Sequence, residues 1–367
     1  MRLCYLLINE NVVIDIKRLE MCLMGIDATN NATIRTVAAE AGVSISTVSR
    51  YLNHPEVVVQ ETRDRIQEAI CKTGYVQNLA ASGLKSRNSK IQLLFVPDIC
   101  NPFYSKMAKR LQQLCSENGT ILMTFDTCES VDREIEAISI ARQVNASGVF
   151  AASVYADEKV IELLADLNIP VVGINSYPAN VPFYSVGVHH LGGTSLAVRH
   201  LIQLGHTDIA FAGGKPGSVI GESRKYGYQY AMKEAGLPIR PEMICEEGFS
   251  EKDGYQAGLR LINAGKMPTA ICCANDLVAF GVIRALREMG LSVPGAVSVT
   301  GMDDTPFASI ADPRLTSVTN DGELFAEKAY QMMKIGSSGN NKPLFVEVPN
   351  ELIVRDSTAA PRTMRGR

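Results

Sequence analysis

From residue 91 onward, short apolar runs alternate with longer amphipathic stretches, and this pattern predicts alternating strands and helices. The predicted strands cover residues 91–96, 120–125, 148–152, 170–174, 208–212, 269–273 and 296–301. The predicted helices cover residues 104–117, 131–144, 157–167, 191–204, 222–234, 252–264 and 276–288. Such repetition is typical of parallel sheets with helices on both faces. About ten strands would overfill one small sheet, so we expect two doubly wound lobes that bind a ligand between them, at the carboxyl ends of the strands.

Residues 33–76 have a different pattern, in which three short apolar stripes recur at helical spacing. Thr33 can cap the first helix, and Gly42 suits the left-handed conformation that ends a helix. Ser44 can cap the second helix, and the third is predicted over residues 62–73. A helix, a tight turn and a second helix within about twenty residues can place the second helix in the major groove of DNA.

Three other segments lack this periodicity. Residues 1–32 are expected to be a disordered extension, and we hypothesise that the protein starts at Met24; a flexible arm is the alternative. An intact mass that includes Met1 would exclude that hypothesis. Residues 78–90 are predicted to be a linker, because a glycine and the short length make a free helix marginal. Residues 359–367 are predicted to be a disordered tail.

Composition excludes several classes of protein. Hydrophobic residues make up 46% and charged residues 20% of the chain, and no apolar run approaches the ~18–20 residues of a membrane helix. The short apolar start lacks a cleavage site, so we expect a cytoplasmic protein with no membrane partner. The nine cysteines form no CxxC motif, which favours reduced, buried thiols over a redox or zinc site. We therefore expect no metal and no cofactor.

The charge is unevenly distributed, although the net charge is only −3. Residues 33–90 carry eight Lys and Arg against five acids, so this segment is +3 and the remainder is −6. A positive segment on an acidic body indicates a modest electrostatic preference for phosphate groups.

Residues 33–53 carry the most specific motif, Thr-Ile-Arg-Thr-Val-Ala-Ala-Glu-Ala-Gly-Val-Ser-Ile-Ser-Thr-Val-Ser-Arg-Tyr-Leu-Asn. The motif resembles the lactose/galactose-repressor family of bacterial transcription regulators, and it matches the family signature at every fixed position. The resemblance continues over residues 91–358 and ends in a strand predicted within residues 349–358. It implies a helix-turn-helix domain over residues 33–77, a hinge over residues 78–90 and a two-lobed core like that of periplasmic binding proteins.

The resemblance also implies which residues contact DNA. Ile45 and Ser46 open the second helix and would face base edges, with Arg50 one turn further. An arginine can donate two hydrogen bonds to guanine, which is worth ~1–3 kcal/mol of discrimination, whereas Ile45 offers only apolar contact. A plain phosphate contact is the alternative for Arg50. Further DNA contacts are expected from short polar side chains, namely Thr33, Ser44, Thr47, Ser49 and Asn53.

In this family the hinge becomes helical on DNA and pushes a leucine into the minor groove. Leu84 matches that leucine, and Asn78 and Ala81 match the residues before it. Gln77 replaces a usual proline and Ser82 a common arginine, so we expect weaker hinge contacts than in the family. Packing within the linker is the alternative role for Leu84.

For the core, the resemblance implies a set of effector-binding residues. Phe103 and Tyr104 are expected to stack on a ligand ring, although one of them could instead pack under its loop. The other expected ligand contacts are Arg224, Phe249, Asn275 and Asp303. Glu222 stands where arginine is common, which would favour ligands with amino or hydroxyl donors. We interpret His200 and His206 as structural.

The motifs favour a regulator over two other classes. The chain has no hydrolase, metalloprotease or phosphate-loop motif, and the glycine-rich run 213–217 fits no phosphate-loop spacing, so we expect no catalytic residues. A stand-alone sugar-binding protein would need an export signal and would lack a helix-turn-helix. We therefore expect a homodimeric repressor that binds a pseudo-palindromic, double-stranded operator. Its effector would be a sugar, the commonest ligand of the family, or less commonly a purine.

Overall fold

The computed structural model describes residues 32–76, 89–178, 180–264, 267–337 and 343–362. The chain divides into two compact units, residues 1–87 and 88–367, whose described parts we call the headpiece and the core. The hypothesised start at Met24 and the hinge residues Asn78, Ala81 and Leu84 lie outside the described residues.

The headpiece contains the three predicted helices. They are α2 (Ile34–Ala41), α3 (Ile45–Asn53) and α4 (Gln60–Thr73), with a 3-10 turn η1 (Pro55–Val57) before α4. Val37, Val48 and Ile66 come from the three different helices and are 0% exposed, so one small apolar core holds the helices together.

The first lobe of the core is a six-stranded sheet with the order β11-β5-β4-β3-β1-β2, in which all neighbouring strands are parallel. Its strands are β1 (Ile91–Val96), β2 (Ile121–Asp126), β3 (Gly148–Ala152), β4 (Val171–Ile174), β5 (Tyr184–Gly187) and β11 (Phe345–Glu347). Its helices are α6 (Pro102–Glu117), α7 (Val131–Gln143), α8 (Glu158–Ala165) and α14 (Gly322–Ser337). We call this part the N-lobe.

The second lobe, the C-lobe, has the order β12-β10-β9-β8-β6-β7, and β12 is antiparallel to β10. Its strands are β6 (Ile209–Ala212), β7 (Ile244–Cys245), β8 (Ala270–Cys273), β9 (Ser298–Asp303), β10 (Thr316–Thr319) and β12 (Leu352–Ile353). Its helices are α9 (His190–Gln203), α10 (Val219–Glu234), α11 (Glu251–Ile262), α12 (Asp276–Glu288) and α13 (Pro306–Ile310), with a 3-10 turn η2 (Pro241–Met243). The predicted pair of doubly wound lobes is therefore confirmed.

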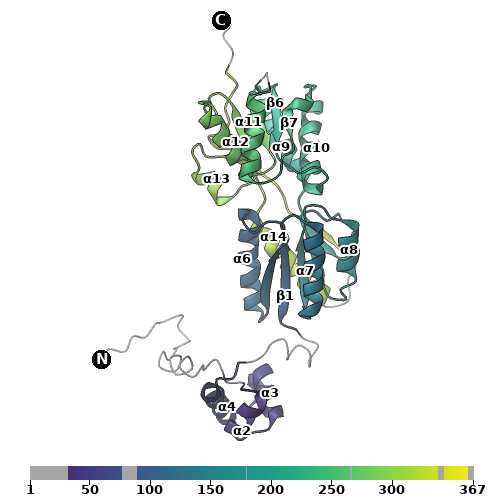
Figure 1. Ribbon diagram of the computed structural model, residues 1–367, viewed down its shortest axis with the longest axis vertical. Helices are drawn as coiled ribbons and strands as arrows, with labels where there is room; N and C mark the ends of the chain where they lie inside the picture. Colours follow the sequence, from purple (N-terminus) through teal and green to yellow (C-terminus); the bar gives the residue numbers. More distant parts are fainter. Residues whose placement is uncertain (1–31, 77–88, 179, 265–266, 338–342, 363–367) are drawn as a thin grey trace, which may run out of the picture. The chain divides into compact units, whose positions relative to one another are not determined.

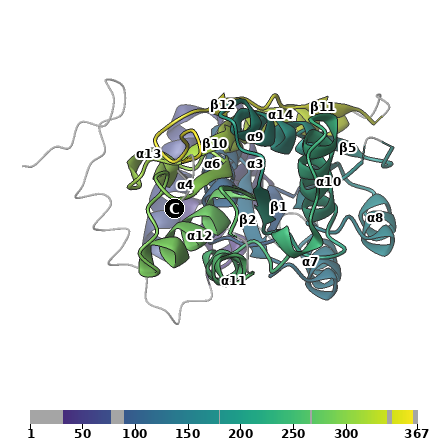
Figure 2. The ribbon, with the colours of Figure 1, turned by 90° about the horizontal axis from the view of Figure 1, so that it is seen from above.

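The chain passes between the two lobes at three places within the described core. It leaves the N-lobe after β5, returns after β10, and leaves again after β11. Helix α14 packs against α6 and β5, so a late segment of the chain completes the first lobe, as the yellow helix among the blue elements of Figure 1 shows. Figure 2 shows α14, β11 and β12 together along one side of the core.

Every strand and helix that the sequence predicted is present, with ends within three residues of the prediction. Two of the expectations for the rest of the chain need correction. The closing strand predicted within residues 349–358 is only two residues long, Leu352–Ile353. Ala359, predicted to begin a disordered tail, is held in place, because its backbone oxygen accepts hydrogen bonds from His206 Nε2 at 2.8 Å and from Ser298 Oγ at 3.0 Å.

The cysteines follow the prediction only in part. Cys115, Cys245, Cys272 and Cys273 are buried, and every cysteine in the described residues is a free thiol. Cys100 and Cys128 are exposed, because they lie in the turns that follow β1 and β2 rather than inside the sheet.

One carboxyl group lies inside the N-lobe. Glu134 on α7 is 2% exposed, and its Oε1 accepts a hydrogen bond from Ser153 Oγ at 2.7 Å. Its Oε2 has no hydrogen-bond partner among the described residues. Burial raises the pKa of Glu134 to about 7, and the Ser153 bond only partly offsets this.

This raised pKa predicts a pH dependence of stability. The folded lobe holds a proton on Glu134 that the unfolded chain releases near pH 4.5, so stability decreases as the pH rises from there to about 7. Glu134→Gln keeps an acceptor for Ser153 and removes the charge. We expect it to raise the free energy of unfolding by about 2–3 kcal/mol at pH 8 and to change little at pH 4. Melting curves of wild type and variant at both pH values measure this.

Glu136→Gln is the matched control, because Glu136 is exposed on the same helix. It is expected to leave the melting curves unchanged at both pH values. An equal shift of the melting temperature for Glu134→Gln at pH 4 and pH 8 would contradict the raised pKa of Glu134.

Candidate functional sites

The turn between α2 and α3 has the predicted geometry. Thr33 caps α2, and its Oγ1 accepts from the backbone N of Thr36 at 3.4 Å. Gly42 has a φ of 63°, which L side chains rarely adopt, so the chain can reverse there. Ser44 Oγ caps α3 by accepting from the backbone N of Thr47 at 3.1 Å. Both predicted caps and the predicted turn are confirmed.

Helix α3 presents one face away from the headpiece core. Val48 is buried, whereas Ser46 and Arg50 are exposed and Ile45 is 44% exposed. Ser44 Oγ lies 2.7 Å from Ser46 Oγ and 2.8 Å from Thr47 Oγ1, so three hydroxyl groups gather at the helix N-terminus. The first turn of α3 contains no acid, so its positive dipole end and these hydroxyls form a surface suited to phosphate oxygens.

Two more predicted DNA contacts come from this helix. Ser49 is half-buried, and its side chain is thus less available than that of Ser46. For Asn53, the structure describes the backbone at the end of α3 but not the side chain.

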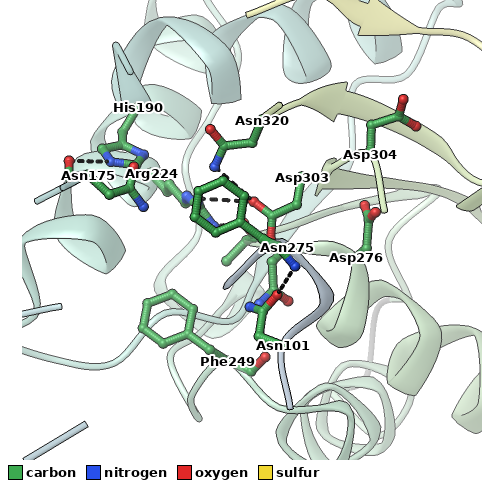
Figure 3. Close-up of polar contacts among 12 residues, drawn as sticks. Asn101, Asn175, His190, Arg224, Phe249, Asn275, Asp276, Asp303, Asp304 and Asn320 are labelled. Atoms are coloured by element: carbon green, nitrogen blue, oxygen red, sulfur yellow. Dashed lines mark hydrogen bonds and ion pairs between the residues drawn. The ribbon is translucent and has the colours of Figure 1, made fainter. Parts of the chain in front are cut away.

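In the core, residues of the two lobes line a cavity, and the empty space among them, part of which is open to solvent, is about 420 Å³. All six predicted effector contacts line it: Phe103, Tyr104, Arg224, Phe249, Asn275 and Asp303. They come from α6 in the N-lobe and from four different segments of the C-lobe, so the fold collects residues that are up to two hundred positions apart. Figure 3 shows how the polar members of this set lie toward one another.

The two aromatic residues of α6 contribute both to the cavity and to the core. Asn101 caps α6 by accepting from the backbone N of Phe103 at 3.0 Å. The ring of Phe103 lies edge-on to Tyr104, at 4.9 Å between centroids, and to Phe325 of α14, at 5.3 Å. Each residue therefore packs under the loop and also lines the cavity, which combines the two alternatives left open by the sequence.

A buried ion pair lies in the C-lobe half of the cavity. Arg224 is 3% exposed and Asp303 7% exposed, and Arg224 Nη2 lies 3.5 Å from Asp303 Oδ1. Arg224 Nη1 also donates to the backbone oxygen of Ala274, and Asn320 Nδ2 donates to Asp303 Oδ1 at 3.1 Å (Figure 3). Burial raises the pKa of Asp303, while Arg224 and Asn320 oppose the rise.

The turn after β9 points the carboxylate of Asp303 into the cavity. Asp303 has a φ of 107° and Asp304 a φ of 46°, both unusual for residues with a Cβ atom. Asp276 holds this turn: its Oδ2 accepts from Thr305 N at 2.7 Å and Oγ1 at 2.9 Å, and its Oδ1 accepts from Ser317 Oγ at 2.5 Å. Burial raises the pKa of Asp276 to about 7. Asp276 is therefore a positioning residue for Asp303.

Asn275 orients the aromatic wall of the C-lobe. It caps α12 by accepting from the backbone N of Val278 at 2.8 Å, and its Nδ2 donates to the backbone oxygen of Phe249 at 2.9 Å. Because both ends of its amide are used, Asn275 fixes the loop that carries Phe249 beside the cavity.

His190 and Asn175 connect the cavity to the first crossover. His190 is the first residue of α9, and its Nε2 donates to the backbone oxygen of Asn175 at 3.2 Å (Figure 3). Burial, and next Arg224, lower the pKa of His190 to about 3, so this imidazole is neutral at physiological pH. Asn175 has a φ of 72° and lines the cavity.

Sequence reasoning missed several residues that line the cavity, namely Asp98, Asn101, Glu129 and Asn175. Asp98 and Asn101 stand in the loop between β1 and α6, and Asn175 directly follows β4, so strand ends were an available signal. The expectation for Glu222 is wrong: its carboxylate lies 2.8 Å from Lys225 Nζ and does not line the cavity.

The two histidines interpreted as structural have structural partners. His206 Nδ1 lies 2.9 Å from Thr269 Oγ1, and His200 Nε2 lies 3.0 Å from Thr358 Oγ1. Within the described ranges, no helix has the length and apolar character that a membrane span requires. The same ranges contain no group of three or more potential metal-ligating side chains.

Two sequence profiles match this chain. The profile of bacterial regulatory proteins of the lacI family matches residues 33–78, and the profile of the periplasmic binding protein-like domain matches residues 198–358. The first covers the helix-turn-helix, and the second covers the C-lobe with the returning α14 and β11.

Relatives match over nearly the whole chain. The HTH-type transcriptional regulator DegA of Bacillus subtilis (strain 168) is 32% identical over 336 residues, which are 90% of this chain and 99% of DegA. Among solved structures, the lac repressor dimer bound to operator and the anti-inducer ONPF has a TM-score of 0.80 at 27% identity, over 90% of this chain and 99% of that one. The transcriptional regulator CelR in complex with cellobiose has a TM-score of 0.67 at 28% identity, over 89% of this chain and 100% of the CelR chain.

These matches include the headpiece as well as the core, which separates this chain from enzymes and from stand-alone binding proteins of similar fold. The chain belongs to the lacI family of bacterial regulatory proteins and is a DNA-binding transcriptional regulator.

Proposed function

We propose that this regulator is a repressor whose operator affinity is controlled by a sugar bound between the lobes of the core. The observation that carries the proposal is the cavity, in which a buried Arg224–Asp303 pair faces aromatic rings from both lobes. Charged and amide groups can exchange hydrogen bonds with hydroxyls, while rings cover the apolar face of a sugar. The structural relative CelR binds cellobiose, which supports this class of ligand.

On the DNA side, we propose that α3 lies in the major groove. Ile45 and Ser46 would contact base edges, and Arg50 would contact either a guanine or a phosphate. Phosphate and sugar contacts would come from the remaining polar residues named from the sequence, Thr33, Ser44, Thr47, Ser49 and Asn53. The hinge residues Asn78, Ala81 and Leu84 would complete the contact in the minor groove.

A homodimer would present two such helices to a pseudo-palindromic operator, whose half-sites lie about one helical turn (~34 Å) apart. The core offers apolar surface for pairing. Ile121 and Met123 are 45% and 43% exposed on β2, an edge strand of the N-lobe sheet, and Ile310 is 75% exposed in the C-lobe. The lac repressor, the related structure, is a dimer on its operator.

The ligand would control DNA binding by shifting the core between two states that differ in the angle between the lobes. A ligand that prefers one angle between the lobes would move the hinges of the dimer and so form or lose the hinge contacts with DNA. Shifting such an equilibrium from 1:99 to 99:1 takes roughly 5.5 kcal/mol of differential binding.

The proposal is tested by anisotropy of labelled DNA from the protein's own promoter and from neighbouring promoters, at ~50 and ~200 mM salt, with and without a panel of sugars. The label is placed on the DNA because the chain has no Trp. Specific binding that weakens with salt and responds to one sugar would support the proposal. Tight sugar binding without any specific DNA site would count against it.

Arg50→Ala separates the two roles left open for this side chain. If Arg50 contacts a guanine, specific affinity decreases by ~1–3 kcal/mol and discrimination at one base pair is lost. If it contacts a phosphate, binding weakens on all sequences. The slope of the logarithm of the binding constant against the logarithm of the salt concentration then decreases in magnitude by about one. Titrations of operator and scrambled DNA at several salt concentrations distinguish these outcomes.

Arg142→Ala is the control, since Arg142 is exposed on α7 of the core and its loss removes the same charge. Unchanged operator affinity in Arg50→Ala would show that α3 does not read DNA in this way.

Asp303→Asn tests the cavity while it keeps the size of the side chain. We expect at least about tenfold weaker binding of the responding sugar, because the charged hydrogen-bond acceptor is lost. The variant also removes the counter-charge of the buried Arg224 and lowers the free energy of unfolding, so both binding measurements are made at a temperature where it is folded. Operator affinity without sugar should then stay within about twofold of wild type. Calorimetry with the sugar and anisotropy with DNA measure the two effects. A variant that responds to the sugar as wild type does would exclude Asp303 from the site.

A further inference from the structure

Acidic residues outnumber basic residues among the residues that line the cavity. Asp98, Glu129 and Asp303 line it, whereas Arg224 is the only lining residue with a positive charge in the described core. Arg224 is committed to Asp303 in the buried pair. No Lys or Arg of the described residues lies within ion-pair distance of Asp98, so the N-lobe half of the cavity carries excess negative charge.

Glu129 lies at the cavity wall, in a turn with an unusual backbone conformation. Cys128 and Glu129 both have a φ of 51°, so two successive residues with a Cβ atom occupy the left-handed region. Such conformations are unfavourable and persist where the surroundings hold them, often at ligand sites. This turn places the Glu129 carboxylate at the cavity wall.

The cationic partner of Glu129 comes from the opposite lobe. Lys215 Nζ lies 3.4 Å from Glu129 Oε2, which is longer than the ~2.7–2.9 Å of a strong charged hydrogen bond. The Lys215 side chain is 43% exposed and does not line the cavity, and its ammonium lies 5.8 Å from the centre of the Tyr155 ring. Lys215 can therefore withdraw to solvent without a burial cost, whereas Glu129, whose side chain is 24% exposed, keeps facing the cavity.

We propose that the effector is a polyhydroxyl ligand with a protonated amine, of the amino-sugar class, and that its ammonium takes the place of Lys215 at Glu129. This inference rests on the proposed function and specifies its ligand. The ring hydroxyls meet Arg224, Asn275 and Asp303 in the C-lobe. The amine meets Glu129 and Asp98 in the N-lobe, so the ligand binds both lobes at once.

A cation fits this cavity better than the alternatives. An anionic ligand would face the excess acids and compete with Asp303 for Arg224. A neutral sugar would bring no cation to the excess negative charge of Asp98 and Glu129, and closing the cavity over it would remove water from these carboxylates. Burial already raises the pKa of Glu129, and Asp98 and Asp253 add to the rise while Lys215 opposes it.

The test is calorimetry on the full chain with glucosamine, galactosamine and mannosamine, each beside its parent hexose and its N-acetyl derivative. We expect one amine to bind about tenfold or more tightly than both neutral counterparts. Glu129→Gln should abolish this preference. Glu222→Gln should keep it, because that carboxylate pairs with Lys225 outside the cavity. Equal binding of a neutral counterpart, no binding of any amine, or an unchanged preference in Glu129→Gln overturns the inference.

Lys215→Met tests the displacement itself. The variant keeps an apolar stem near Tyr155 and removes the competing ammonium, so the amine should bind several-fold more tightly than to wild type. Weaker binding would mean that Lys215 helps to hold the ligand, which overturns the displacement.

Operator anisotropy, run in parallel, separates this inference from the function on which it rests. A protein that binds operator DNA and responds only to neutral hexoses keeps the proposed function and loses the inference. A protein without specific DNA binding loses the proposed function, whichever ligand it binds.

Discussion

The cavity of this regulator depends on one buried ion pair, Arg224 with Asp303. A buried guanidinium is tolerated only with a counter-charge and further hydrogen-bond partners, because leaving water costs several kcal/mol per ion. Asp303 can supply that charge only because the chain leaves β9 with a φ of 107°, a conformation that itself costs ~1–3 kcal/mol. Three hydrogen bonds to Asp276 hold the turn, so the pair is in place before any ligand arrives.

The same residues tie the cavity to the connections between the lobes. Asn320 lies in the second crossover and donates to Asp303, and His190 at the end of the first crossover donates to the backbone of Asn175. In the proposed two-state coupling, a ligand group that competes for the Asp303 carboxylate would therefore act directly on the second crossover between the lobes. Such a coupling between ligand and lobe angle would need no long pathway, because the crossover segments hydrogen-bond to residues that line the site.

The sequence predicted the parts of this structure that have a strong local signal. Long periodic helices and buried strands have one, and strand ends that open helices located Asn275 and Asp303. Glu129 was missed because a left-handed conformation at a residue with a Cβ atom cannot be read from residue type, whereas Asn175 follows a predicted strand and could have been found. The two-residue strand β7 is too short to show periodicity. Helix α14 was not predicted, although its apolar stripe was readable. The error at Glu222 has a geometric cause, since positions two apart on a helix face different sides and Arg224 occupies the cavity side.

In the proposed coupling, hydrogen bonds from the ligand to buried polar atoms of the cavity would supply part of the free energy. Arg224 Nε, Asn175 Oδ1 and His190 Nδ1 are buried without hydrogen-bond partners among the described residues, at the place where the two lobes meet. An unpaired buried polar atom costs ~1–3 kcal/mol, so a ligand that reached all three atoms at only one lobe angle would contribute to the ~5.5 kcal/mol of differential binding that a full two-state shift requires. The set contains one donor and two acceptors, and a hydroxyl group can both donate and accept. A polyhydroxyl ligand can therefore form hydrogen bonds with all three atoms. An apolar ligand of equal size would fill the same space without forming these hydrogen bonds, so it would not supply this part of the coupling free energy.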